Sequence, residues 1–168
     1  MQSNSVCKNS HDHEFRGSNA FTLLELVLVL TIVATVSSVV AMRYATASVR
    51  YRTDVTARQI ILDLALARSE ARHRSTMKTV VFDLLTNSYT IPEVADLRSP
   101  DGTGADYKTD LAGEPYHARL VSVDFGGSAK VVFDGFGNVD NGGTIVVGVG
   151  DVQKTIVLNG DTGIAAVQ

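Results

Sequence analysis

The chain of 168 residues has very little cysteine, proline and tryptophan. Its one cysteine, Cys7, excludes a disulfide within the chain and a metal site built from several cysteines. Tryptophan is absent, and the prolines begin only at Pro92. Neither proline nor glycine occurs from 21 to 75, so nothing in that stretch interrupts a helix.

The common catalytic motifs are missing as well. The sequence has no G-x-S-x-G nucleophile turn, no H-E-x-x-H zinc helix and no G-x-x-x-x-G-K phosphate loop. His73 and His117 are isolated, and the spacing of Asp101 and Asp106 does not match a calcium-binding loop. We therefore expect no catalytic residue, no metal and no cofactor, and we predict that the protein is not an enzyme.

Charge is almost absent from residues 21–42, where Glu25 is the one charged residue. A helix of this length spans about 33 Å, enough for the hydrocarbon core of a bilayer. An acid in such a segment costs ~2.5–3.5 kcal/mol on insertion and usually has a function. We predict a transmembrane or filament-core helix over 21–42. A secretory signal cut at residues 45–47 is the alternative, but its apolar region would be shorter.

The residues that open this segment read Ala20-Phe21-Thr22-Leu23-Leu24-Glu25. They resemble the processing site of type IV pilins and type II secretion pseudopilins, although the family usually has glycine where this chain has Ala20. In that family a prepilin peptidase cuts before the aromatic residue and methylates the new amine. The resemblance implies a leader over 1–20, cleavage between Ala20 and Phe21, and N-methylation of Phe21.

The motif gives Glu25 a physical role in filament assembly. In a filament its carboxylate can meet the Phe21 amine of a neighbouring subunit. At about 4 Å and an effective dielectric near 20, the attraction is about 4 kcal/mol before desolvation. Loss of one partner would leave a buried charge, so the pair would act as a check on subunit docking. The alternative is that Glu25 only reaches toward the membrane interface.

The helical pattern continues over 43–75 as an amphipathic extension. One stripe carries Ile60, Ile61, Leu64, Ala67 and Ala71, and Asp63 is expected to lie off it. Residues 43–78 have a net charge of +5, from eight basic and three acidic residues. This basic band either contacts anionic lipid headgroups or forms a solvated helix face.

The run Leu66-Ala67-Arg68-Ser69-Glu70-Ala71 resembles the helix end shared by the GspH/FimT branch of pseudopilins and minor pilins. The stretch from Phe133 to Gly137 resembles the Phe-x-x-x-Gly strand end of the same family. We interpret Arg68 and Glu70 themselves as ordinary surface charges.

From Lys78 onward the apolar pattern changes to a period of two, and glycine-rich turns separate short runs. We predict a β-domain over 76–168, with antiparallel strands and no further helix. The stretch 93–115 is expected to be a long acidic loop that is solvated or contacts a partner. The predicted strands lie at 79–84, 89–91, 117–125, 130–134, 144–149, 153–158 and 163–167.

These observations predict an α+β protein, with a long N-terminal hydrophobic helix of the pilin type packed on an antiparallel β-sandwich. The resemblance implies a minor pseudopilin of a type II secretion system, anchored in the inner membrane with its β-domain in the periplasm. The expected partners are the prepilin peptidase, other pseudopilins, membrane lipid and secreted cargo.

Two other functions remain open. One is a FimT-like minor pilin for DNA uptake, but nucleic acid is not expected here because no basic residue follows Lys154. The other is an anchored β-domain that never polymerises.

Overall fold

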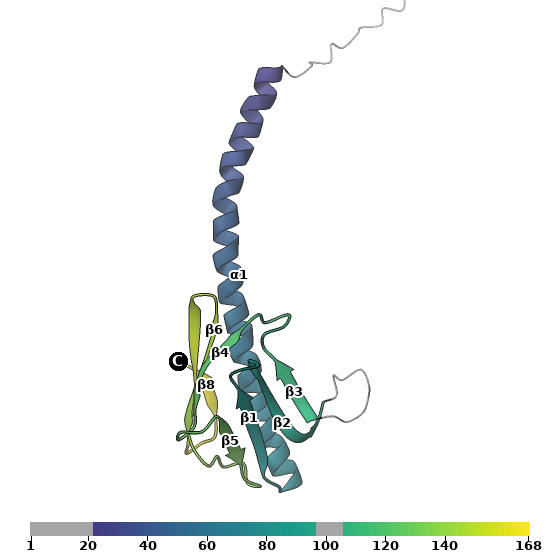
Figure 1. The fold of residues 1–168 in the computed structure, drawn as a ribbon, viewed down its shortest axis with the longest axis vertical. Coiled ribbons are helices and arrows are strands. Elements are labelled where there is room, and N and C mark those ends of the chain that lie inside the picture. The colour runs from purple at the N-terminus through teal and green to yellow at the C-terminus, as the bar shows by residue number, and fades with distance from the viewer. Residues whose placement is uncertain (1–21, 97–105) are drawn as a thin grey trace, which may run out of the picture. The chain divides into compact units, whose positions relative to one another are not determined.

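A computed structural model describes residues 22–96 and 106–168, without the side chains of 39–43 and 45. The chain divides into two compact units, Met1–Ala41 and Met42–Gln168. Figure 1 shows the long helix and the short strands that follow it. The second unit contains the end of the helix and all the strands.

The helix, α1, spans Leu23–Arg74, as the lack of proline and glycine predicts. It ends in a left-handed turn at Ser75, whose φ is 51°. The Ser75 amide donates to the Arg72 carbonyl at 3.3 Å, and the Thr76 amide donates to the Ala71 carbonyl at 3.1 Å. These two bonds form a Schellman motif, which satisfies carbonyls that the helix leaves free.

In the described part of the chain, eight strands follow the helix and form two antiparallel sheets of four strands each. The first sheet has the order β3-β2-β1-β5, and the second has the order β4-β6-β7-β8. The strands are β1 (Lys78–Asp83), β2 (Ser88–Ala95), β3 (Asp106–Asp110), β4 (Arg119–Asp124), β5 (Lys130–Phe133), β6 (Gly143–Val149), β7 (Val152–Leu158) and β8 (Ala165–Val167). The predicted α+β class with antiparallel sheets is confirmed.

One core joins the C-terminal half of α1 to both sheets. The buried stripe of the helix is Ala57, Ile60, Leu64, Ala67 and Ala71, spaced three and four residues apart. Ile61, which the sequence placed on this stripe, is only half-buried. Alanine at three of the five positions lets the helix backbone approach the strands closely.

Aromatic rings connect the two sheets at the centre of the domain. The ring of Phe82 on β1 stacks on that of Phe125, which follows β4, with centroids 5.9 Å apart. Phe82 also packs against Tyr89 of β2 at 5.4 Å. The buried inward positions of both sheets therefore meet in a single apolar layer.

The prediction of one continuous loop over 93–115 is wrong. Strand β2 extends to Ala95, and β3 occupies Asp106–Asp110 and pairs with β2. The inward side chains of β3 are Tyr107 and Thr109, and charged residues alternate with them. The strand reads as polar because its outward face is charged and Thr109 faces inward. Residues 97–105 of the predicted loop lie outside the described part.

Within the part of the chain that the structure describes, no helix combines the length and the apolar character that a membrane span needs. The predicted transmembrane segment covers residues 21–42. The structure does not describe Phe21 or the side chains of 39–42. That prediction is therefore not supported here.

We predict that Ile60→Ala destabilises the protein by about 2–5 kcal/mol, because it leaves a cavity between α1 and the sheets. Leu62→Ala is the matched control, since Leu62 lies two positions along the same helix and is 63% exposed. Its effect should stay within about 0.5 kcal/mol. Denaturant unfolding of the full chain in detergent measures both. Equal losses for the two variants would contradict the packing described here.

Candidate functional site

The start of α1 places Glu25 in the first helical turn. Thr22 caps the helix, because its Oγ1 accepts a hydrogen bond from the Glu25 amide at 3.2 Å. The Thr22 carbonyl accepts the next bond, from the Leu26 amide at 3.1 Å. Thr22 and Glu25 thus have the spacing of a capping box, and the acid lies where the helix dipole favours negative charge.

The helix around Glu25 is apolar on every face. Its large apolar side chains are all about half exposed or more, from Val29 at 47% to Leu23 at 82%. The set comprises Leu23, Leu24, Leu26, Val27, Leu28, Val29, Leu30, Ile32, Val33 and Val36. A helix that is hydrophobic all round needs an apolar environment on all sides. Within the described part of the chain, these side chains are left without such an environment.

The other predicted site residues, Ala20 and Phe21, lie outside the described residues. The pairing of Glu25 with a Phe21 amine, the cleavage and the methylation therefore stay predictions. The Glu25 side chain is exposed to solvent in the single chain.

A second carboxylate on α1, that of Asp63, is buried, with 4% of the residue exposed. The hydroxyl of Tyr89 donates to its Oδ2, and that of Tyr107 donates to its Oδ1 at 2.7 Å. Gln59 Nε2 and Thr109 Oγ1 donate at 2.9 Å and 3.3 Å. The expectation that Asp63 lies off the buried face is wrong, because β2 and β3 supply hydroxyl groups that the helix pattern cannot show.

This cluster fixes α1 to the first sheet. A buried carboxylate is costly unless its oxygens accept hydrogen bonds, and here four groups donate to them. Burial, and then the negative charge of Asp63, raise the pKa of Tyr89 far above its ordinary value. Tyr89 therefore stays protonated and continues to donate. With its acceptors occupied, Asp63 acts as a structural residue and not as a general base.

The C-terminal end of α1 holds the loop that follows β5. Arg68 Nε donates to the Gly137 carbonyl at 2.9 Å, and Arg72 Nε donates to the Phe136 carbonyl at 3.0 Å. A side chain at Gly135 would bring a Cβ to 2.9 Å from the Ser75 backbone, so glycine permits the close approach. The interpretation of Arg68 as an ordinary surface charge is wrong.

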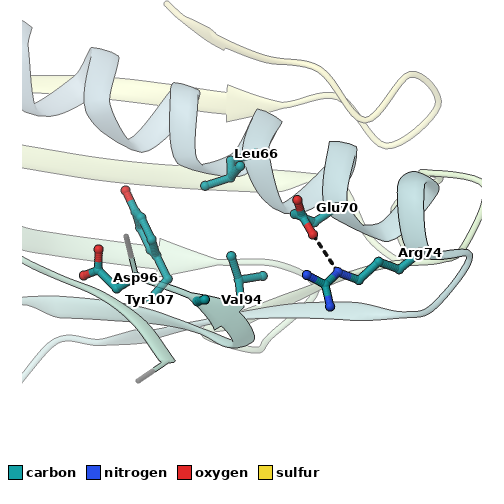
Figure 2. Close-up of a pocket in the computed structure, with 7 residues that line it drawn as sticks. Leu66, Glu70, Arg74, Val94, Asp96 and Tyr107 are labelled. Atoms are coloured by element: carbon teal, nitrogen blue, oxygen red, sulfur yellow. Dashed lines mark hydrogen bonds and ion pairs between the residues drawn. The ribbon is translucent and has the colours of Figure 1, made fainter. Parts of the chain in front are cut away.

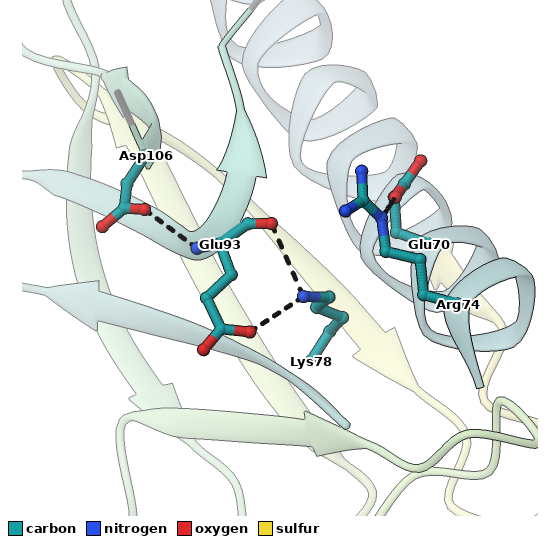
Figure 3. A network of polar contacts seen from close by, with 5 residues as sticks. All are labelled: Glu70, Arg74, Lys78, Glu93 and Asp106. Atoms are coloured by element: carbon teal, nitrogen blue, oxygen red, sulfur yellow. Dashed lines mark hydrogen bonds and ion pairs between the residues drawn. The ribbon is translucent and has the colours of Figure 1, made fainter. Parts of the chain in front are cut away.

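Most of the basic band at the end of α1 is engaged within the domain. Arg74 pairs with Glu70 at 2.9 Å. Lys78 is buried, and its ammonium group contacts the Glu93 carboxylate at 3.0 Å, as Figure 3 shows. The Glu93 amide in turn donates to Asp106 Oδ1 at 2.9 Å. These contacts tie β1 to the irregular end of β2, where Glu93 has a φ of 60°.

A cavity of about 240 Å³ lies between α1 and the ends of β2 and β3. Figure 2 shows the Glu70–Arg74 ion pair on one side and Val94 and Tyr107 on the other. No nucleophile stands beside a base among the described residues that line this cavity. Among the described residues, no group of three His, Cys, Asp or Glu side chains could hold a metal ion.

The family model described as type II transport protein GspH matches residues 56–162. The chain belongs to the GspH family. A solved structure, the minor pseudopilin EpsH from the Type 2 Secretion System of Vibrio cholerae, resembles this chain with a TM-score of 0.51. The likeness covers 70% of this chain and 96% of EpsH at 18% identity, so it concerns the fold. No curated protein matches the chain.

The GspH match includes the helix end, the Asp63 cluster and the strands β1 to β7, but it begins after Glu25 and ends before β8. The family assignment therefore rests on the β-domain and the buried half of α1.

We predict that Asp63→Ala lowers the free energy of unfolding by more than about 2 kcal/mol, because it leaves several buried hydroxyl donors without an acceptor. Tyr107→Phe removes one donor and should cost about 1 kcal/mol. Denaturant unfolding of the full chain compares them. A loss for Asp63→Ala no larger than that for Tyr107→Phe would show that the carboxylate is not the centre of the cluster.

Asp134 gives a pH-dependent prediction. Hydrogen bonds from the side chain and then the amide of Asn138 are the main causes that lower the pKa of Asp134 below its ordinary value of 3.8. The stabilisation is therefore complete above that value and is lost as pH falls through the lower folded pKa. Unfolding measured below pH 3.8 should show this loss. Asn138→Ser should weaken it, and an unchanged pH profile would contradict the assignment.

Proposed function

We propose that the chain is a minor pseudopilin of a type II secretion system and assembles into a pseudopilus that supports protein export. The observation that carries the proposal is the GspH family match, combined with an apolar stretch of α1 whose large side chains are about half exposed or more. The β-domain would contact neighbouring subunits or secreted cargo. Its hydrogen-bonded attachment to α1 would let the helix carry it within a filament.

The proposal includes processing before assembly. A prepilin peptidase would cut between Ala20 and Phe21 and methylate the Phe21 nitrogen, as the resemblance implies. Until assembly, the apolar stretch 21–42 would hold the chain in the inner membrane with the β-domain in the periplasm. The low charge of this stretch supports the location, since Glu25 is its one charged residue.

Glu25 would pair with the Phe21 ammonium of the adjoining subunit. Its exposed side chain and apolar neighbours support this role, because docking would bury a charge that then needs a partner. The capping-box spacing gives a competing role within the helix, in which the side chain serves only its own first turn. Pairing with an ammonium group requires a charged side chain, whereas a capping box does not.

DNA uptake has less support. Arg74 and Lys78 already form ion pairs with glutamates of the domain. Fewer cations of the basic band are therefore available for phosphate contacts.

Glu25→Gln separates the two roles of this residue. Glutamine keeps the hydrogen-bonding capacity that a capping box uses but removes the charge. We expect at least a tenfold loss of the chain from sheared pseudopili, because an attraction of a few kcal/mol disappears. Glu25→Asp, which keeps the charge, should lose less. Immunoblots of sheared filaments and of secreted cargo measure both variants.

Normal assembly of Glu25→Gln would refute the charge pairing and leave the capping role. Assembly must be compared at equal amounts of folded protein, judged by protease resistance of the β-domain. Amino-terminal sequencing of the membrane-extracted protein gives an independent check of processing. A mature chain that starts anywhere other than Phe21 would contradict the proposal.

A further inference from the structure

A groove of about 280 Å³ runs along α1 beside the segment that leads into β8. Ile61, Leu64 and Ile164 form its apolar walls, while Arg68 and Arg72 supply positive charge. Among the described residues that line it, none is acidic. The groove thus combines apolar surface with two cations that have no opposite charge in it.

The two arginines are held in place by their Nε atoms. Arg68 bonds to the Gly137 carbonyl and Arg72 to the Phe136 carbonyl, which leaves further N–H donors on each guanidinium group. Among the described residues, no carboxylate forms an ion pair with either arginine. Burial, and then the charge of Arg72, lower the pKa of Arg68. A carboxylate between them would relieve this repulsion.

The turn between β1 and β2 of the same chain carries an acidic residue and exposed leucines, which complement the positive charge and the apolar walls of the groove. Leu85 is 95% exposed and Leu84 is 39% exposed, and both follow the exposed Asp83. The Asp83 carboxylate accepts hydrogen bonds from the Leu85 amide at 2.9 Å and the Thr86 hydroxyl at 2.8 Å. These bonds, that of Thr86 first, lower the pKa of Asp83. The turn therefore presents an exposed carboxylate, held by bonds within the turn, beside two exposed leucines.

The turn and the groove lie on different parts of the domain. Strand β1 starts at Lys78, just after the end of α1, and Figure 1 shows it leading away from that end. The turn follows the far end of β1, whereas the groove runs along the last turns of α1. Contact between two such unlike surfaces is heterologous, so it can repeat from copy to copy without closing.

We propose that the groove beside Arg68 and Arg72 binds the Asp83–Leu85 turn of a second copy of this chain. The carboxylate would lie against the two guanidinium groups, and the leucines against Ile61 and Ile164. The contact goes beyond the proposed function, since it involves neither Glu25 nor Phe21. It is small, so it should form mainly where copies are concentrated in a membrane or filament.

Disulfide cross-linking tests the contact in the full chain. Cys7→Ser removes the one native cysteine. One tagged copy then carries Leu85→Cys, and a second carries Ile164→Cys. Oxidation in membranes should link these two at least fivefold more than a control pair of Leu85→Cys with Tyr51→Cys. Tyr51 is a suitable control because it is 70% exposed and lies ten positions before Ile61 on α1.

The second part of the experiment tests whether the cross-linking yield depends on the charge of Asp83. Asp83→Asn keeps an oxygen that can accept the amide bonds of the turn but removes the charge, and it should lower the yield at least fivefold. Asp151→Asn, at an exposed acid in the β6–β7 turn, should leave the yield unchanged. Equal yields for the test and control pairs, or no response to Asp83→Asn, would overturn the proposal. Linkage of the Ile164→Cys copy only to a different protein would also overturn it.

The cross-linking is repeated in a Glu25→Gln background. The proposed contact predicts that the linked pair still forms there. Failure of the groove contact and failure of the proposed role of Glu25 therefore give different results.

Discussion

The hydrogen bonds to the buried Asp63 carboxylate set the position of α1 on the first sheet. The apolar stripe of alanine, isoleucine and leucine also holds the helix, but apolar packing is not directional. The hydroxyl groups of Tyr89 and Tyr107 must reach particular oxygens of one side chain, so they fix the rotation and translation of the helix. Further contacts hold the helix to the rest of the domain, where Lys154 of β7 pairs with Asp54.

Two carboxylates on the same helix are in opposite situations. Asp63 is buried with its oxygens occupied, so its hydrogen bonds stabilise a contact within one molecule. Glu25 is exposed among leucines and valines that are themselves about half exposed or more. An acid with its acceptors filled is part of the fold, whereas an exposed acid in an apolar segment is available to a second molecule. This contrast is the physical basis of our proposal that the first half of α1 serves in assembly.

Much of the fold could be predicted because the signals are local. The uninterrupted stretch before Ser75 gave a single helix, and alternating residues with glycine-rich turns gave most of the strands. Strand β3 was missed because Asp106, Lys108 and Asp110 make it resemble a loop. The role of Arg68 was missed because its partner, the Gly137 carbonyl, lies far along the chain and is a backbone group. Neither error could be corrected from residue types alone.

The sequence by itself determined the long helix, the change from helical to strand periodicity and the single charge of the apolar segment. Each depends on neighbours within a few positions, where backbone sterics and side-chain spacing act directly. The tertiary structure alone decided that Asp63 is buried, that Arg68 and Arg72 hold the loop after β5, and that no acidic residue among the described ones lines their groove. Those properties depend on hydrogen-bonding groups supplied by distant strands and loops, and no local pattern records which groups folding will bring together.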